Sequence, residues 1–224
     1  MEEVALLASG GLDSCVLIAD LAKRTRVHPV YVMFGLTWEP AERAALERFL
    51  PALNSDAVEP LTLLEVPAAT VYCDHWSLTG QGVPDAQTSD AAVLLPGRNV
   101  LMLAVTAVWC SLRDIHTIAM GTLSATPFAD ATPEFFRDYA RCLGAGLAPH
   151  HIKINTPYRD RTKADVIAEF PDLPLHLTLT CLAPTSDAHG PLHCGACNKC
   201  AERKLAFEQA DVNDPTRYAI RERP

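Results

Sequence analysis

The stretch Ala8-Ser9-Gly10-Gly11-Leu12-Asp13-Ser14 decides the fold of this 224-residue chain. The apolar residues 4–7 come before it and are typical of a buried parallel strand. Residues 15–23 follow it and are long and apolar enough for a packed helix. A strand, a glycine-rich turn and a helix in this order form an anion site. Glycines let backbone N–H groups approach one phosphate, and a helix begins with a partial positive charge.

The polar residues of this turn add chemistry to its shape. Ser9 and Ser14 can donate hydroxyl hydrogen bonds to phosphate oxygens, and Asp13 can hold a metal ion or orient the loop. A Gly-Gly pair alone would indicate only a tight turn, with Asp13 or Ser14 capping the helix. Two glycines, two hydroxyls and a carboxylate together favour a nucleotide phosphate site, although the Gly-Lys-Ser/Thr ending of a Walker loop is missing. The expected binding residues are Ser9, Gly10, Gly11, Leu12, Asp13 and Ser14.

The composition excludes several classes of protein. The length of the chain suits one α/β domain with an appendage or two small domains. With 49% hydrophobic residues, the chain can form a core that needs no disulfide bonds or metal ions for its stability. A net charge of -8 and the lack of a Lys/Arg run argue against a broad nucleic-acid surface. No signal-peptide pattern or membrane-length apolar run is visible in the sequence. We therefore expect no nucleic-acid partner, no membrane partner and a cytoplasmic location.

The rest of the chain alternates between strand-like and helix-like segments. Further buried strands are predicted at residues 27–34, 61–66, 115–121 and 152–157. Helices are predicted at residues 42–50, at 100–112, from Thr132 or Pro133 onward and at 163–170. Such alternation predicts a parallel sheet with right-handed crossovers, and its carboxyl edge should bring together residues 9–14, 34–39 and 121–130. Residues 67–95 are expected to be a mobile loop, either a binding lid or disorder without a role.

A second turn before a helix is also rich in donors. Pro96-Gly97-Arg98-Asn99 again brings backbone N–H groups to a helix start, where Arg98 offers a planar five-donor fork and Asn99 can be the cap. Thr162 can cap the helix at 163–170. Lys163 then either reaches a phosphate at the same sheet edge or is an ordinary solvated lysine.

The cysteines form the second strong pattern. Four of the eight cysteines have the spacing Cys181-x12-Cys194-x2-Cys197-x2-Cys200, and Gly195 permits a tight knuckle. Four thiolates suit a closed, structural tetrahedral Zn²⁺ site with Zn–S bonds of about 2.3 Å. The alternatives are an iron–sulfur cluster, a redox pair, no metal, or His189 or His193 in place of one sulfur. The scattered Cys15, Cys73, Cys110 and Cys142 are expected to be buried free thiols.

The ordered set of motifs resembles the QueC-type 7-cyano-7-deazaguanine synthase family of N-type ATP pyrophosphatases. The matching segments span almost the whole chain: Ser9 to Ser14, Pro96 to Asn99, Thr162-Lys163, Leu179-Thr180-Cys181, the cysteine knuckle, Arg203 and Ala206-Phe207. The resemblance implies a Rossmann-like parallel sheet of the adenine-nucleotide alpha-hydrolase type in a homodimer. It also implies an ATP-binding α/β domain at residues 1–175 and a small zinc-binding C-terminal region at 176–224.

The family chemistry implies an ATP-dependent C–N ligase that forms AMP and pyrophosphate. With Mg²⁺, ATP adenylates the small-molecule carboxylate 7-carboxy-7-deazaguanine, ammonia displaces AMP to give the amide, and a second ATP drives dehydration to the nitrile. On this resemblance Asp13, Arg98 and Lys163 are the expected catalytic residues. The nucleotide site would also include Gly97, Asn99 and Gly121.

Two segments depart from the family pattern. Family members usually follow the second strand with Tyr-Gly-Gln and a nearby His, where this chain has Phe34-Gly35-Leu36-Thr37-Trp38. The segment after the fourth strand, residues 124–133, lacks the usual acidic residue and Gly-Tyr-Pro-Asp-Cys-Arg, and the gap after Cys181 is longer than usual. The alternatives are therefore a paralogue that adenylates another small acid or a protein C-terminus, or a nucleotide-binding module without turnover. A related RNA thiolase would need a basic surface and a reactive Cys near the loop, and neither is evident.

Overall fold

The computed structural model describes residues 2–124 and 126–219, so Ala125 of the segment 124–133 and the last five residues of the region 176–224 lie outside the described residues. Its centre is a five-stranded parallel sheet with the strand order β3-β2-β1-β4-β5. The strands are β1 Glu3–Leu7, β2 Arg26–Met33, β3 Thr62–Glu65, β4 Thr117–Ala119 and β5 Lys153–Asn155. The predicted Rossmann-like sheet is confirmed, and its strand order reverses direction beside β1, where such sheets bind ligands.

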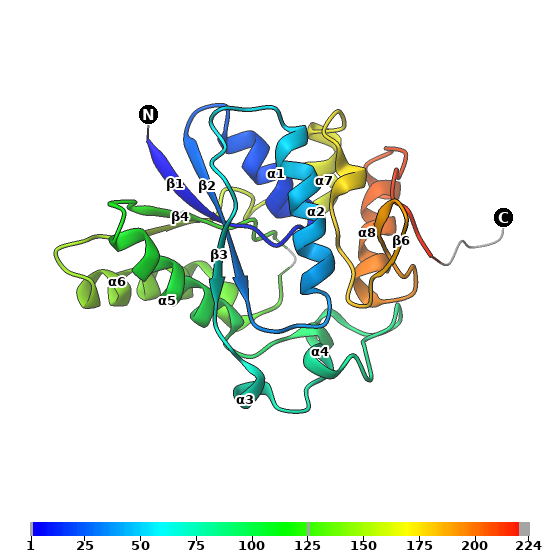
Figure 1. Cartoon of the computed structure of the whole chain (residues 1–224), viewed down its shortest axis with the longest axis horizontal. Helices are drawn as coiled ribbons and strands as arrows, with labels where there is room; N and C mark the ends of the chain where they lie inside the picture. Colours follow the sequence, from blue (N-terminus) through cyan, green and yellow to red (C-terminus); the bar gives the residue numbers. More distant parts are fainter. Residues whose placement is uncertain (1, 125, 220–224) are drawn as a thin grey trace.

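Helices cover both faces of this sheet (Figure 1). One face packs against α1 Leu12–Leu21, α2 Glu39–Ala52, α7 Lys163–Glu169 and α8 Asn198–Gln209; the other packs against α5 Arg98–Ser111 and α6 Pro133–Gly146. In β1, Val4 and Leu6 belong to the first hydrophobic cluster and Ala5 and Leu7 to the second. Burial on both sides explains why β1 is an unbroken apolar run.

Threonine side chains cap two helices at this edge of the sheet, and the predicted cap Thr162 is confirmed. Thr132 accepts a hydrogen bond from the backbone N–H of Phe135 at the start of α6, just after the 3-10 turn η2 Ala129–Ala131. Thr162 and Asp165 form a reciprocal capping box at the start of α7. These caps fix the entry of both helices at the carboxyl side of β4 and β5.

The segment 67–95 contains short helical turns, where the sequence predicted a loop without regular structure. It contains α3 Ala69–Tyr72, α4 Trp76–Thr79 and the 3-10 turn η1 Asp90–Val93. The ring of Trp76 stacks on that of Trp38, with centroids 5.4 Å apart, and Ser77 is fully buried. Asn198 of α8 donates to the carbonyl of Thr88. Contacts with Trp38 and Asn198, which lie far from this segment in the sequence, therefore hold a segment whose composition is glycine-rich and polar.

The C-terminal region packs onto the main core. After the 3-10 turn η3 Leu175–Leu177, the long gap between Cys181 and Cys194 is filled by a hairpin of β6 Thr185–Asp187 and β7 Gly190–Leu192. Ala206 and Phe207 of α8 belong to the same hydrophobic cluster as α1 and α7. The domain boundary at residue 175 stays a prediction. Within the described ranges, no helix has both the length and the hydropathy that crossing a membrane requires.

Candidate functional site

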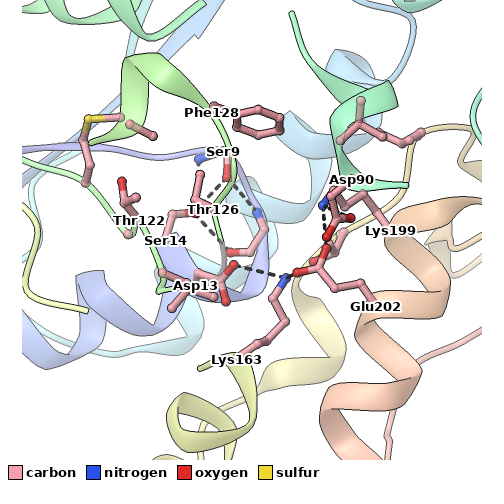
Figure 2. A pocket seen from close by; sticks show the side chains of 18 of the residues that line it. Ser9, Asp13, Ser14, Asp90, Thr122, Thr126, Phe128, Lys163, Lys199 and Glu202 are labelled. Carbon is pink, nitrogen blue, oxygen red and sulfur yellow. Dashed lines mark hydrogen bonds and ion pairs between the residues drawn. The ribbon is translucent and has the colours of Figure 1, made fainter. Parts of the chain in front are cut away.

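A cavity of about 530 Å³ lies at the carboxyl edge of the sheet, beside the ends of β1, β2 and β4. Its wall includes residues from all three segments expected at this edge, together with the starts of α5 and α7 (Figure 2). This volume is within the usual range for small-molecule sites. The predicted residues on the wall are Ser9, Gly11, Asp13, Ser14, Arg98, Asn99, Gly121 and Lys163. Gly10, Leu12 and Gly97 are not on it.

Hydrogen bonds of the Ser9 and Ser14 hydroxyls fix the shape of the loop after β1. The backbone N–H of Ser9 donates to Ser14 Oγ at 3.2 Å, and the hydroxyls of Ser9 and Ser14 lie 3.1 Å apart. Ser14 Oγ also donates to the carbonyl of Gly11 at 3.1 Å, and the N–H of Gly11 donates to Ser9 Oγ at 3.3 Å. Gly11 is the N-cap of α1, so neither Asp13 nor Ser14 is the cap.

Two glycines allow the close approaches that shape this loop. Gly10 has φ +70°, and a Cβ there would lie 2.6 Å from the carbonyl oxygen of Glu42. A Cβ on Gly121 would lie 3.1 Å from the carbonyl carbon of Asp13. Leu12, by contrast, packs in the hydrophobic core. The loop therefore packs closely between α2 and the end of β4. Only glycine fits at position 10, and a Cβ at position 121 would require its neighbours to move by a few tenths of an ångström.

Lys163 lies at the centre of the polar part of the cavity. Its Nζ is 3.3 Å from Asp13 Oδ2 and 2.6 Å from Glu202 Oε1, and its side chain is 8% exposed (Figure 2). The interpretation as a solvated lysine is therefore excluded. Burial alone would lower the pKa of Lys163, but the carboxylates of Asp13 and Glu202 hold it above its ordinary value. Lys163 is a fixed cation beside the glycine-rich loop after β1.

The two carboxylates around Lys163 differ in their surroundings. Burial raises the pKa of Asp13, although Lys163 opposes that shift, and Asp13 Oδ1 is shielded from solvent without a hydrogen-bond partner among the described residues. For Glu202, burial is outweighed by Lys163 and Lys199, which lower its pKa to about 2. Glu202 was not predicted, because nothing in the sequence distinguishes it from the other charged residues of α8. Asp13 Oδ1 is an oxygen free to coordinate a cation such as Mg²⁺.

The turn before α5 differs in one respect from its prediction. The N-cap of α5 is Gly97 at φ +72°, so the prediction of Asn99 as the cap is wrong. Asn99 instead donates from Nδ2 to the carbonyl of Asp130 at 3.0 Å, and its backbone N–H donates to Asp130 Oδ2 at 3.1 Å. A carboxylate from the loop after β4 thus satisfies the helix start. Arg98 lines the cavity, and its Nε is buried with no partner in the part of the chain that the structure describes.

Two buried glutamates of α2 were not predicted. Glu39 accepts hydrogen bonds from the backbone N–H groups of Phe34 at 2.6 Å and Gly35 at 3.0 Å, which fixes the segment after β2. Glu42 accepts from the hydroxyl of Tyr31 at 2.6 Å. Burial raises the pKa of Glu42 to about 7, against the opposing charge of Arg98. A glutamate in the first turn of a helix is usually exposed, so the sequence pattern did not indicate this burial.

The remaining wall of the cavity is mostly aromatic and apolar. Trp38 is buried and stacks with Trp76. Phe128 belongs to the loop after β4 and lines the cavity. The apolar lining residues include Val32, Val93, Leu95, Met102 and Met120. Trp38 and Phe128 belong to the two segments in which the chain departs from the family pattern, so both departures face the same cavity.

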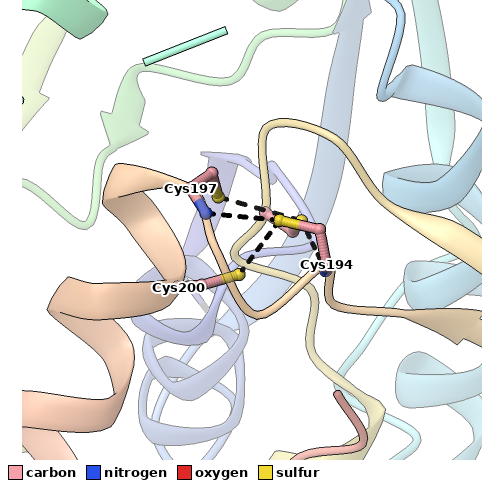
Figure 3. A group of neighbouring side chains, drawn as sticks. Cys194, Cys197 and Cys200 are labelled. Carbon is pink, nitrogen blue, oxygen red and sulfur yellow. Dashed lines mark hydrogen bonds between the residues drawn. The ribbon is translucent and has the colours of Figure 1, made fainter. Parts of the chain in front are cut away.

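The four predicted zinc ligands lie together beside this cavity (Figure 3). All four sulfurs lie within 4.8 Å of one another, with 3.8 Å between Cys194 and Cys200 and 4.0 Å between Cys181 and Cys197. A tetrahedron with Zn–S bonds of about 2.3 Å has edges of about 3.8 Å, so the donor set fits zinc. Gly195 has φ +83° at the knuckle. His193 points elsewhere and accepts from the N–H of Thr180, which excludes it as a ligand in this arrangement.

The cysteine cluster and the loop after β1 share hydrogen bonds. The N–H of Leu179 donates to the carbonyl of Gly10 at 2.7 Å, and the N–H of Leu12 donates to Thr180 Oγ1 at 3.4 Å. The fully buried Arg203 donates to Thr180 Oγ1 at 3.3 Å and to Thr178 Oγ1 at 2.9 Å. Because Thr180 directly precedes Cys181, the position of the cysteine cluster is coupled to the shape of the loop.

Comparison with known proteins gives a consistent result. The model of the family "Queuosine biosynthesis protein QueC" matches residues 3–211. The 7-cyano-7-deazaguanine synthase of Methanopyrus kandleri is 30% identical, with 97% of this chain and 99% of that protein covered. The protein of the same name from Methylococcus capsulatus is also 30% identical at the same coverage, and that from Acidobacterium capsulatum is 26% identical over 98% of both chains.

Proposed function

This chain belongs to the QueC family of queuosine biosynthesis proteins, and on that premise we propose that it is an ATP-dependent synthase of the deazapurine pathway. The proposed reaction converts 7-carboxy-7-deazaguanine into 7-cyano-7-deazaguanine, with ammonia as the nitrogen source and AMP and pyrophosphate as products. The proposal includes Mg²⁺ as the ion of the ATP complex, a homodimer as the assembly and the cytoplasm as the location.

The observation that carries the proposal is the buried Lys163 between Asp13 and Glu202. A cation fixed at the end of a glycine-rich loop and a helix start matches the charge of a nucleotide triphosphate. Asp13 Oδ1 and Arg98 Nε are the polar atoms left without a partner among the described residues on this wall. The first suits Mg²⁺ and the second suits a phosphate oxygen. Gly10, Gly97 and Gly121 would then act through backbone shape.

The chemistry follows from the weakness of a carboxylate as an electrophile. A carboxylate oxygen attacks the α-phosphorus of ATP, and the bond to pyrophosphate breaks. Ammonia then attacks the carbonyl carbon, the bond to AMP breaks and the nitrogen loses a proton. For the nitrile, the amide oxygen attacks the α-phosphorus of a second ATP and the bond to pyrophosphate breaks. The bond from carbon to the AMP oxygen then breaks, and the two amide protons leave. Lys163 and Arg98 would stabilise the charge that develops on the phosphates, and the loop would hold the α-phosphorus in line.

One observation favours a second candidate, a paralogue that adenylates a different carboxylate. Trp38 and Phe128 replace family segments and both line the cavity. An aromatic wall of this kind selects an acceptor by shape and stacking more than by hydrogen bonds. The adenylation half of the reaction would be the same, so the two candidates differ only in the acid.

The test is to incubate the purified protein with ATP, Mg²⁺, ammonium and 7-carboxy-7-deazaguanine and to follow products by mass spectrometry. We expect amide or nitrile to accumulate together with AMP and pyrophosphate. The Lys163→Met variant should form none of these products. AMP release with other acids, and none with this one, would support the second candidate. Nucleotide binding without AMP formation for any acid would contradict both.

A further inference from the structure

A second group of metal-ligating side chains lies far from the cavity, at the amino edge of the sheet. It consists of Asp114, His116 and His150, whose ligand atoms all lie within 4.8 Å of one another. Asp114 Oδ1 is 3.3 Å from His116 Nε2 and 3.8 Å from His150 Nδ1. Neither the four-cysteine cluster nor the proposed reaction uses these residues.

The sheet itself brings the two histidines together. His116 directly precedes β4, and His150 lies in the turn that leads into β5. Thr117 and Lys153 are register partners in these adjacent parallel strands, and the N–H of Lys153 donates to the carbonyl of His116 at 2.8 Å. Backbone pairing therefore fixes His116 beside the segment that enters β5, whereas Asp114 lies in the turn between α5 and β4.

The tautomer of each ring follows from its hydrogen bond to a carbonyl oxygen. His116 Nδ1 lies 3.1 Å from the carbonyl oxygen of His151, and His150 Nε2 lies 2.9 Å from that of Ile115. A carbonyl only accepts, so the proton of each neutral ring is on the nitrogen that faces it. The lone pairs of His116 Nε2 and His150 Nδ1 then face the carboxylate of Asp114.

This arrangement is the one that proteins use for imidazole ligands. A ligating histidine normally donates its other N–H to a backbone carbonyl or carboxylate, which fixes the ring. Two imidazole nitrogens and a carboxylate oxygen within 4.8 Å of one another are a donor set that a single cation can share. The two rings have centroids 4.3 Å apart and planes inclined by 19°, so their lone pairs meet at a shared ion only after the rings reorient.

We propose that Asp114, His116 and His150 bind a divalent transition-metal cation such as Zn²⁺. Two imidazoles and one carboxylate favour zinc, nickel or copper over magnesium and calcium, which prefer oxygen ligands. Three protein ligands leave a fourth position for water, because the side chain of Asp114 is 90% exposed. The site is distinct from the closed four-cysteine cluster, and it lies at the edge of the sheet opposite the cavity.

The experiment measures zinc binding to the purified full chain whose cysteine cluster is already loaded. The probe is Zn²⁺ alone, titrated against a chromophoric competitor in a buffer without imidazole, with total metal measured by mass spectrometry. We expect two zinc equivalents in the parent protein. Asp114→Asn, in which Asn tolerates the φ of +58°, should weaken the second equivalent by more than about 10-fold.

His151→Ala is the matched control, because His151 contributes only its backbone carbonyl and the alanine variant keeps it. This variant should retain the second equivalent, whereas His116→Ala should lose it. His116 is half exposed, so this variant tests the proposal even if the Asn variant folds poorly. A single equivalent in the parent protein, or equal loss in His151→Ala, would overturn the proposal.

Discussion

The two walls of the cavity are built in opposite ways. The loop wall, defined by residues 9–14 with Lys163, consists of short polar groups that are bonded to one another and to backbone atoms. The aromatic wall, defined by Trp38, Trp76 and Phe128, is held by ring stacking and apolar contact. The loop wall presents donors at fixed positions, whereas the aromatic wall presents mainly surface and shape.

This difference separates the two tasks of the proposed reaction. A triphosphate has the same charge and covalent structure for every enzyme that uses it, so fixed donors and a fixed cation suit it. An acid substrate varies between enzymes, and a stacked aromatic surface can accept a new planar acid by small changes in shape. Substitutions on the loop wall should therefore alter nucleotide chemistry, and those on the aromatic wall should alter acceptor preference.

The largest effect is expected for Lys163→Met. Its removal leaves the carboxylate of Asp13 without a cation, while Glu202 keeps Lys199, so AMP formation should fall by about 10³-fold or more. The loss of one partner of a buried ion pair should cost about 3–5 kcal/mol of unfolding free energy. The rate of AMP formation measures the first effect, and urea unfolding measures the second. Lys153→Met, on the exposed side of β5, is the control and should change neither the rate of AMP formation nor the unfolding free energy by much. An unchanged rate in Lys163→Met would contradict the proposed role of Lys163 in the reaction.

The pH dependence of stability should report on Glu42, which lies between the two walls. Its pKa is raised by burial from 4.5 to about 7, with Arg98, Tyr31 and Glu39 as its charged or titratable neighbours. The protonated form is therefore favoured in the folded state. This contribution is fully present below about pH 4.5 and is lost as the pH rises through about 7.

Glu42→Gln keeps the shape and removes the titration. The unfolding free energy of the variant relative to the parent should increase by about 3 kcal/mol between pH 4.5 and pH 8. Urea unfolding at each pH measures this difference. Glu47→Gln, on the exposed side of the same helix, should give a difference that does not change with pH in this way.

Gly10 and Gly97 form a matched pair, because both have φ near +70°. A Cβ at Gly10 would lie 2.6 Å from the carbonyl oxygen of Glu42. A Cβ at Gly97 would have no described atom within 4 Å apart from those of its chain neighbours. Gly10→Ala should destabilise the fold by about 2–3 kcal/mol, and Gly97→Ala by about 1 kcal/mol. Thermal unfolding compares them. Equal losses would mean that the loop wall is not clamped against α2.

Thr180→Val tests the connection between the loop wall and the cysteine cluster. It removes the hydroxyl that accepts from Leu12 and Arg203, at an expected cost of about 1–2 kcal/mol. The KM for ATP should rise several-fold while the KM for the acid stays nearly constant. Thr216→Val also removes a partner of Arg203, but one away from the loop, and should leave the KM for ATP unchanged.

The smallest effect on the fold is expected for Phe128→Leu. The substitution keeps an apolar side chain at a partly buried position, so stability should change by less than about 1.5 kcal/mol. The KM for the acid should rise a few-fold and the KM for ATP should not. A change in the KM for ATP alone would contradict the division of the cavity into two walls.

The sequence alone was enough for the sheet and the cysteine cluster because both leave local patterns. Buried parallel strands are continuous apolar runs, and Cys-x-x-Cys spacing places two thiolates at one ion over a single knuckle. The predicted cap Thr162 was confirmed for the same reason, because a cap depends on three or four neighbouring residues. The segment 67–95 was misjudged because its order comes from Trp76 packing on Trp38, which is distant in the sequence.

By itself the sequence determined the parallel α/β fold, the glycine-rich loop and the zinc-type cysteine set, because strand burial, backbone freedom and ligand spacing are properties of short stretches of chain. Only the tertiary structure decided that Lys163 is a buried cation and that Glu202 is its partner. It also decided that Asp130 and not Asn99 satisfies the start of α5, and that Glu42 is buried. Each of these facts depends on segments that the fold brings together from far apart, and the pairing of charges across such distances has no local signature.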